Sequence, residues 1–275
     1  MNLNTFDKFS DDYKTMEKMP VLFLGHGSPM NALEENIFVQ GFRNIGEEIP
    51  KPNAIICISA HWFTSGTFVT AMEMPKTIHD FYGFPKELFE VQYPAKGNPQ
   101  LAKETAELLA PALAQEDHNW GLDHGTWSVL KHLYPNADIP VIQLSIDYTK
   151  PPQYHFELAK KLSKLREKGI LIIGSGNIVH NLRLIDWKNI DTIGAGWDWA
   201  KEAQEKTNHW ILDGNFQKLI DYQKQGVFLQ YAVPSPDHFL PMIYSIALKE
   251  KSENILLFND SLIAGSLSMT SIKIG

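Results

Sequence analysis

The chain has 275 residues, 44% of them hydrophobic and 21% charged, which is typical of a folded globular protein and excludes a disordered one. Its net charge of −7 is spread along the chain without a basic block, so nucleic acid is not expected as a partner. The single cysteine, Cys57, excludes a disulfide framework and a CxxC metal site, and its place in an apolar run predicts an inert core residue.

The N-terminal segment and the lengths of the apolar runs predict where the protein works. Residues 1–18 are polar with mixed charges and do not resemble a signal peptide. No apolar run approaches the roughly 18 residues that a membrane-spanning helix needs. We therefore expect a cytoplasmic protein with no membrane partner, and the sequence leaves its oligomeric state open.

Strand and helix signals alternate along the chain. Residues 1–19 are predicted to form a tail and residues 20–275 a single domain, because no repeat or linker interrupts them. Apolar runs predict four buried strands, at Val21–Leu24, Ala54–Ser59, Val141–Ile146 and Ile170–Ile173. Later periodicity predicts four helices and a final β pair, at Asn98–Ala110, Tyr154–Lys168, Trp197–Leu212, Leu240–Lys249, Ile255–Phe258 and Ser266–Ile274. This pattern predicts an α/β fold with a mostly parallel or mixed central sheet and helices on both faces.

Three histidines follow the ends of predicted strands. His26 and His61 each lie two residues beyond a strand, and His180 lies past the end of a third. In open α/β sheets, ligands collect beyond the carboxyl ends of the strands, so we expect these side chains to line a site. Glycines on both sides of His26 permit a tight turn and close approach of the backbone to a ligand. A single histidine in such a place is usually ordinary, but three at successive strand ends indicate chemistry.

Two further histidines lie among residues typical of a site. His124 lies in a loop with two tryptophans and two glycines, just ahead of a predicted helix, and His238 lies in a proline-rich segment. Asp237 is placed to cap the helix that follows. Asp123 is predicted either to orient a histidine or to be exposed to solvent.

The remaining histidines have weaker signals. His132, His155 and His209 fall within predicted helices among polar neighbours and are expected at the surface, and His118 is expected in a solvent-facing loop. His79 precedes aromatic residues, and lining the pocket or lying in an ordinary loop are equally good interpretations.

A set of histidines restricts the metal but does not select one. Neutral imidazoles bind zinc, iron, copper or nickel, whereas calcium and magnesium prefer oxygen ligands. Zinc with three histidines and a water would support hydrolysis, while ferrous iron with open positions would support oxygen chemistry. Both remain open from spacing alone.

Six motifs together resemble a known family. They are, in chain order, Gly25-His26-Gly27-Ser28-Pro29-Met30, Ser59-Ala60-His61-Trp62, Thr77-Ile78-His79-Asp80-Phe81, Asp123-His124-Gly125 with Trp127, Gly176-Asn177 with His180-Asn181, and Pro236-Asp237-His238. In order and spacing they resemble the class III extradiol ring-cleaving dioxygenases, in the branch of the 4,5-DOPA extradiol dioxygenases. The resemblance runs from about Pro20 to Met269.

The resemblance implies a metal enzyme that opens the ring of a small aromatic diol, a catechol such as L-DOPA, with O2. It implies metal ligands at His26, His61, His180 and His238, and an acid/base at His124. The metal it implies is Zn²⁺ or Fe²⁺, one per chain. Where the wider family has two histidines and a carboxylate, this sequence has His238 at the third position.

The catechol would need aromatic packing and an ordered set of ligands. Trp62 and Trp127, with His79, are expected to line the substrate pocket. Because four histidines around tetrahedral zinc would leave no room for substrate, we expect His26, His61 and His238 to bind the metal. His180 is then a fourth ligand or a nearby hydrogen-bond donor.

Two other functions are consistent with the same residues. A zinc hydrolase would use metal-bound water on an amide or ester and would consume no O2. A non-catalytic metal-binding interaction protein on the same fold is the third interpretation, since a fold does not guarantee catalysis. An intact acid/base motif around His124 argues against the last.

Overall fold

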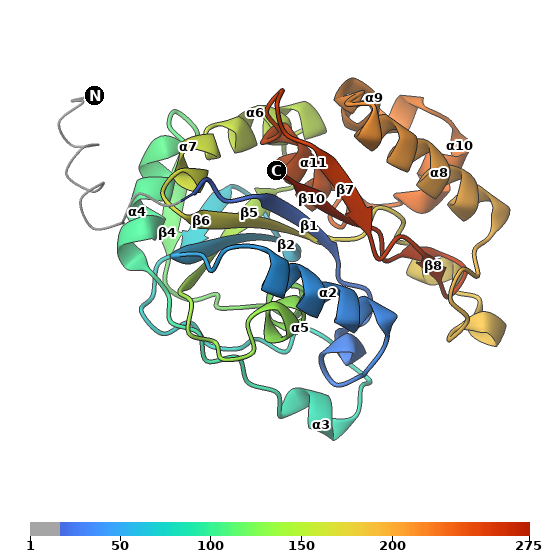
Figure 1. Ribbon diagram of the computed structural model, residues 1–275, viewed down its shortest axis with the longest axis horizontal. Coiled ribbons are helices and arrows are strands. Elements are labelled where there is room, and N and C mark those ends of the chain that lie inside the picture. Colours follow the sequence, from blue (N-terminus) through green and yellow to red (C-terminus); the bar gives the residue numbers. More distant parts are fainter. Residues whose placement is uncertain (1–16) are drawn as a thin grey trace.

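The computed structural model describes residues 17–275 (Figure 1), and the predicted tail up to residue 16 lies outside the described residues. Two sheets are present in this part of the chain. The larger sheet has eight strands, β1 (Val21–Gly25), β2 (Ala54–Thr64), β3 (Thr67–Thr70), β4 (Ala114–Asp117), β5 (Val141–Asp147), β6 (Ile170–Gly176), β7 (Ile255–Phe258) and β10 (Ser271–Ile274). The smaller sheet pairs β8 (Leu262–Ile263) with β9 (Leu267–Ser268).

The large sheet is mixed but parallel at its centre. Its strand order is β4-β3-β5-β2-β6-β1-β10-β7. Strands β5, β2, β6 and β1 pair in parallel, while β10 and β7 extend one edge in antiparallel pairing and β3 joins the other side antiparallel to β5. The carboxyl ends of β2, β6 and β1 therefore lie side by side, which confirms the predicted α/β class.

Helices cover both faces of this sheet (Figure 1). Their bounds are α2 (Ile37–Glu48), α3 (Lys86–Phe89), α4 (Pro99–Leu108), α5 (His124–Leu133), α6 (Pro152–Lys160), α7 (Ser163–Arg166), α8 (Asp198–Leu212), α9 (Phe216–Ile220), α10 (Val227–Ala232) and α11 (Leu240–Ala247). Helices α2 and α5 lie on one face, and α6 and α11 lie on the other. Short 3-10 turns occur at Pro29–Ala32, Leu182–Leu184, Trp187–Asn189 and Tyr222–Lys224.

Alternating residues of the central strands feed two cores. In β2, Ile56 and Ile58 pack into the core beneath α11, whereas Ile55 and Cys57 pack into the core beneath α5. Because successive strand residues point to opposite faces, a strand covered on both sides is apolar at nearly every position. This burial explains the continuous apolar runs, and it also makes Cys57 an inert residue whose pKa is raised by burial.

The element boundaries differ from prediction in a few places. The predicted helix Tyr154–Lys168 is two helices, α6 and α7. Between them the backbone hydrogen bonds join residues three apart, from Lys161 to Leu158 and from Leu162 to Ala159, which interrupts the α-helical pattern. The predicted final strand, Ser266–Ile274, is two strands, β9 in the smaller sheet and β10 in the larger one. Strands β3 and β4 and helix α2 were not predicted.

Two histidines expected at the surface are buried, so that expectation was wrong. His132 is 7% exposed, and its Nε2 lies 2.7 Å from the carbonyl oxygen of Asn31. His155 is fully buried, and its Nδ1 lies 2.9 Å from the hydroxyl of Tyr244. A hydrogen-bonding partner inside the fold makes each burial tolerable. The predictions for His118 and His209 are confirmed, since both side chains are mostly exposed.

None of the helices in the described residues has the length and apolar character needed to span a membrane.

The buried His155 predicts a pH dependence of stability. Burial lowers the pKa of His155 from 6.5 to about 4. Below pH 6.5 the His155 imidazole binds a proton in the unfolded chain but stays neutral in the folded chain. The free energy of unfolding therefore decreases as the pH falls from 6.5 to 4. Between pH 6.5 and pH 4, we expect the free energy of unfolding, measured in urea, to decrease less in His155→Asn than in the parent. The difference between the two decreases should be on the order of 2–3 kcal/mol. His209→Asn, at an exposed position, should behave as the parent, and equal losses in all three proteins would contradict the prediction.

Candidate metal centre

His26 is held at the carboxyl end of β1. Its backbone N–H donates to the carbonyl of Gly176 in the neighbouring strand β6, and the residue is 2% exposed. The chain can turn here because Gly27 has a φ of +62°, a conformation that suits glycine. The Nδ1 of His26 lies 2.9 Å from the Ser175 hydroxyl, and that hydroxyl donates its one proton to the carbonyl of Gly125.

The tautomer of His26 follows from this network. Because the Ser175 hydroxyl donates its proton to the Gly125 carbonyl, it can only accept a hydrogen bond from the His26 ring. The proton of the neutral imidazole therefore sits on Nδ1, and Nε2 carries a lone pair. A histidine held in this way through one nitrogen is suited to bind a metal through the other.

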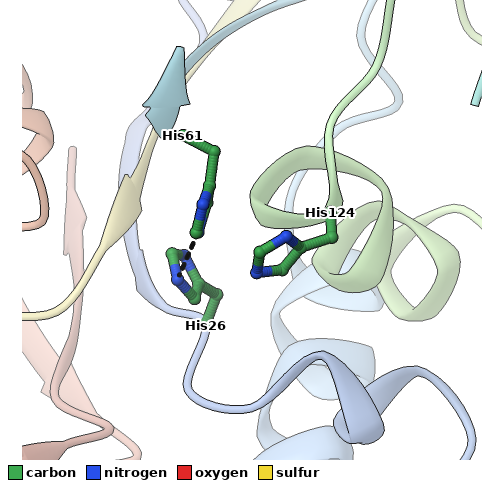
Figure 2. A group of neighbouring side chains, drawn as sticks. All are labelled: His26, His61 and His124. Atoms are coloured by element: carbon green, nitrogen blue, oxygen red, sulfur yellow. Dashed lines mark hydrogen bonds between the residues drawn. The ribbon is translucent and has the colours of Figure 1, made fainter. Parts of the chain in front are cut away.

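His61 lies inside β2, not beyond it as the sequence suggested. The register between β2 and β5 shifts between Ile58 and Phe63, and His61 lies within this irregular stretch. Such bulges re-aim side chains at the edges of sites. The Nε2 of His61 lies 3.3 Å from the Nε2 of His26 (Figure 2). The Nδ1 of His61 lies 3.3 Å from the Asp80 carboxylate.

His124 is the first residue of α5 and enters the same space. Figure 2 shows its ring pointing toward those of His26 and His61. Its Nδ1 lies 3.0 Å from Oδ2 of Asp80, and its backbone N–H donates to Oδ1 of the same carboxylate. Gly125 makes the approach possible, since a Cβ there would lie 2.8 Å from the ring of His61.

His180 and His238 form the remaining side of the cluster. Their rings stack in parallel, with centroids 3.5 Å apart and an angle of 5° between the planes. The Nδ1 of His238 hydrogen-bonds to Asp237, which leaves its Nε2 free. His180 follows β6 and is fixed through its backbone N–H, which donates to Ala232. All five histidines predicted to carry the chemistry thus lie close to this edge of the sheet.

Burial keeps several of these imidazoles neutral. Burial first, and then the neighbouring histidines, hold the pKa values of His26 and His61 well below the ordinary value. Burial and the adjacent His238 lower the pKa of His180 to about 3. Neutral imidazole is the form that binds metals, so these rings are available as ligands across the physiological range.

The two carboxylates of the cluster remain ionised. Burial would raise the pKa of Asp80, but hydrogen bonding and electrostatic interaction with His124 outweigh burial and lower it. For Asp237, the hydrogen bond and charge of His238 likewise outweigh burial and lower the pKa. The site therefore combines neutral imidazoles with two anionic acceptors, a set that attracts a divalent cation.

Two groups of side chains have the spacing of metal ligands within residues 17–275. The ligand atoms of His26, His61 and His124 lie within 4.8 Å of one another, and those of His180, Asp237 and His238 form a second such group. The buried first group could bind a metal ion.

The predicted aromatic residues have more varied places. Trp62 stacks on Trp120, with centroids 5.7 Å apart. The Nε2 of His79 hydrogen-bonds to the Val91 carbonyl, and the ring packs near Trp127. Trp127 is fully buried, and its indole N–H donates to the Ile78 carbonyl. Their contact with a substrate stays a prediction.

The acidic residues have different roles from those predicted. Asp123 is fully buried, caps α5 through Thr126, and accepts from Ser59 and Gln143, so its exposure is excluded. Asp237 bonds to His238 and caps no helix. Asp80, which sequence reasoning did not single out, contacts two site histidines. The sequence indicated a role for Asp80 only through its place beside His79 in one of the motifs that resemble the dioxygenase family.

Comparison with known proteins identifies the family. Residues 20–258 match the family described as the catalytic LigB subunit of aromatic ring-opening dioxygenase. The chain belongs to this family. The match confirms the resemblance read from the motifs, and the protein is an extradiol ring-cleaving dioxygenase acting on an aromatic substrate with O2.

Individual relatives of this extradiol dioxygenase cover nearly the whole chain. The 4,5-DOPA dioxygenase extradiol of Escherichia coli (strain K12) is 46% identical over 261 residues, which is 94% of this chain and 95% of that protein. The Beta vulgaris protein of the same name is 33% identical, over 91% of this chain and 94% of its own length. The crystal structure of an uncharacterized Escherichia coli K12 protein has a TM-score of 0.81 at 41% identity, covering 94% of this chain and all of that one.

Proposed function

We propose that this extradiol dioxygenase opens the ring of a catechol such as L-DOPA at a ferrous ion held by His26, His61 and His238. The observation that carries the metal site is the pair of nitrogens 3.3 Å apart, Nε2 of His26 and Nε2 of His61. The proton of each ring is engaged at Nδ1, by Ser175 and Asp80, so two lone pairs face each other. A cation between them removes this repulsion.

The spacing of the rings supports His238 as the third ligand. Centroid separations are 5.1 Å for His26–His61, 5.2 Å for His26–His238 and 5.0 Å for His61–His238. Imidazoles bound tetrahedrally at metal–nitrogen distances of about 2.0–2.1 Å have centroids roughly 5 Å apart. Each of the three also has its Nδ1 held by another side chain, the usual arrangement around a metal.

His124 and His180 are less suitable as ligands than His238, although a ring nitrogen of His124 lies within 4.8 Å of those of His26 and His61. The His124 ring is 3.8 Å from that of His61 but 5.9 Å from that of His26, so its spacing is uneven. The His180 ring stacks face to face on that of His238, with centroids 3.5 Å apart, so the two rings are not arranged to bind one ion through their nitrogens. We assign both to positions beside the metal.

Iron is favoured over zinc by the reaction. Zinc has no redox chemistry, whereas ferrous iron, when bound, offers open positions for the diol and O2 and a path for electrons between them. The ring opens at the carbon–carbon bond next to the diol, and both atoms of O2 enter the product. The catechol itself supplies the electrons, so no other reductant is needed.

The protein residues supply binding and proton transfer. The Nδ1 of His124 lies 3.0 Å from the Asp80 carboxylate. Its Nε2 is then the nitrogen available to accept a catechol proton and return it during ring opening. Phe81 packs edge-on against the His124 ring, with centroids 5.5 Å apart. The names of the similar proteins support L-DOPA as the substrate and cleavage at the 4,5 position.

Reconstitution tests this function directly. Metal-stripped protein is loaded without oxygen with Fe²⁺ or Zn²⁺ and then mixed with L-DOPA in an oxygen electrode. We expect Fe²⁺ alone to support O2 uptake, in a one-to-one ratio to a yellow ring-opened product. No uptake by fully iron-loaded protein, together with zinc-dependent hydrolysis of an ester or amide, would indicate the zinc hydrolase instead.

The role of His124 has its own test. Asn keeps a polar group near the position of Nδ1 but has nothing at Nε2, so His124→Asn should bind iron as the parent does. Loss of acid/base catalysis should lower kcat by roughly 10²–10⁴-fold. The exposed His118 provides a matched control, and His118→Asn should leave the rate unchanged. An unchanged rate in His124→Asn would remove this residue from the mechanism.

A further inference from the structure

Asp80 lies on a loop that is fixed against the start of α5. Thr77 pairs with Leu122 in an isolated bridge, and the backbone N–H of Ile78 donates to the same Leu122 at 2.7 Å. These contacts bring the loop to the segment that leads into His124. The Asp80 side chain is 17% exposed and faces the histidine cluster.

The two oxygens of the Asp80 carboxylate have separate partners. Oδ1 accepts the backbone N–H of His124 at 2.9 Å. Oδ2 lies 3.3 Å from Nδ1 of His61 and 3.0 Å from Nδ1 of His124. One oxygen therefore anchors the first residue of α5, and the other faces the rings of two histidines.

No such sharing occurs at the other two proposed ligands. The Nδ1 of His26 is held by Ser175, and that of His238 by Asp237. Among the hydrogen bonds and ion pairs of residues 17–275, Asp80 is the carboxylate that faces two histidines of the cluster.

We propose that Asp80 is a positioning residue that fixes His61 and His124 as one unit, so that metal affinity and the orientation of the acid/base depend on the same oxygen. This inference rests on the proposed function, which makes His61 a ligand and His124 the acid/base. The carboxylate can only accept, and its Oδ2 lies 3.3 Å from Nδ1 of His61 and 3.0 Å from Nδ1 of His124, so it favours the tautomer of both rings that is protonated at Nδ1 and has its lone pair at Nε2. Partners of this kind orient ligands and increase their basicity.

The substitution Asp80→Asn tests the two carboxylate oxygens independently. Asn retains the oxygen that accepts from the backbone of His124, and it replaces Oδ2 by an NH2 group that opposes the two Nδ1 protons. The fold should therefore persist while the rings lose their acceptor. We expect Zn²⁺ affinity, measured by competition with a chelator, to fall roughly 10–100-fold. We also expect the ¹⁵N signals of the His124 ring to shift in the zinc-loaded protein.

Asp237→Asn is the matched control, because it removes the acceptor of one ligand only. It should lower Zn²⁺ affinity over the same range while the His124 ring signals stay at their positions in the parent. In iron-loaded protein at saturating metal, Asp80→Asn should also lower kcat with little change in KM. If Asp80→Asn does not fold, Asp80→Ala has the same expected affinity and ring signals.

The outcomes separate this inference from the proposed function. Zn²⁺ affinity equal to that of the parent, or unshifted His124 signals, in a folded Asp80 variant would overturn the positioning role. Zinc binding and the ring signals require no O2 chemistry. If they change as expected while iron-loaded parent protein consumes no O2, Asp80 keeps its role and the dioxygenase mechanism is the part that fails.

Discussion

The parallel pairing of β2, β6 and β1 is the constraint on which the site depends. It brings three carboxyl ends to one edge, so His61 in β2 and His26 after β1 arrive on either side of β6, which leads to His180. The backbone bond from His26 to Gly176 of β6 locks this edge together. Without this register the two Nε2 atoms would not lie 3.3 Å apart.

Several imidazoles can lie together in a buried space only if they are neutral and if neighbouring side chains fix their orientation. Burial and mutual repulsion lower the pKa values of His26 and His61, which keeps protons from competing with a metal. Ser175, Asp80 and Asp237 then fix which nitrogen is protonated. The buried, closely spaced imidazoles with facing lone pairs are unfavourable without a cation. The same arrangement makes them a good cation site.

Much of this could be predicted from the sequence because it depends on local pattern. Apolar runs predicted the central strands, and histidines just beyond them predicted the site edge. Short or polar strands were missed, since β4 reads Ala-Gln-Glu-Asp and has no apolar alternation. His155 was misplaced because its partner, Tyr244, is 89 residues away and only the fold brings them together.

The role of Asp80 could not be predicted for the same reason. It precedes His124 by 44 positions, and its contact depends on a bridge between Thr77 and Leu122 that no local pattern indicates. Asp123, directly beside His124 in sequence, was the natural candidate. Its carboxylate is used instead to cap α5 and to bind Gln143 and Ser59.

The assignment of His26, His61 and His238 as the metal ligands is tested most directly by anomalous diffraction from crystals of the metal-loaded protein, collected at the absorption edge of the metal. We expect one strong peak between Nε2 of His26 and Nε2 of His61, within bonding distance of a His238 nitrogen. A peak bonded to His124 in place of His238, or one beside Asp237 and His180, would contradict it.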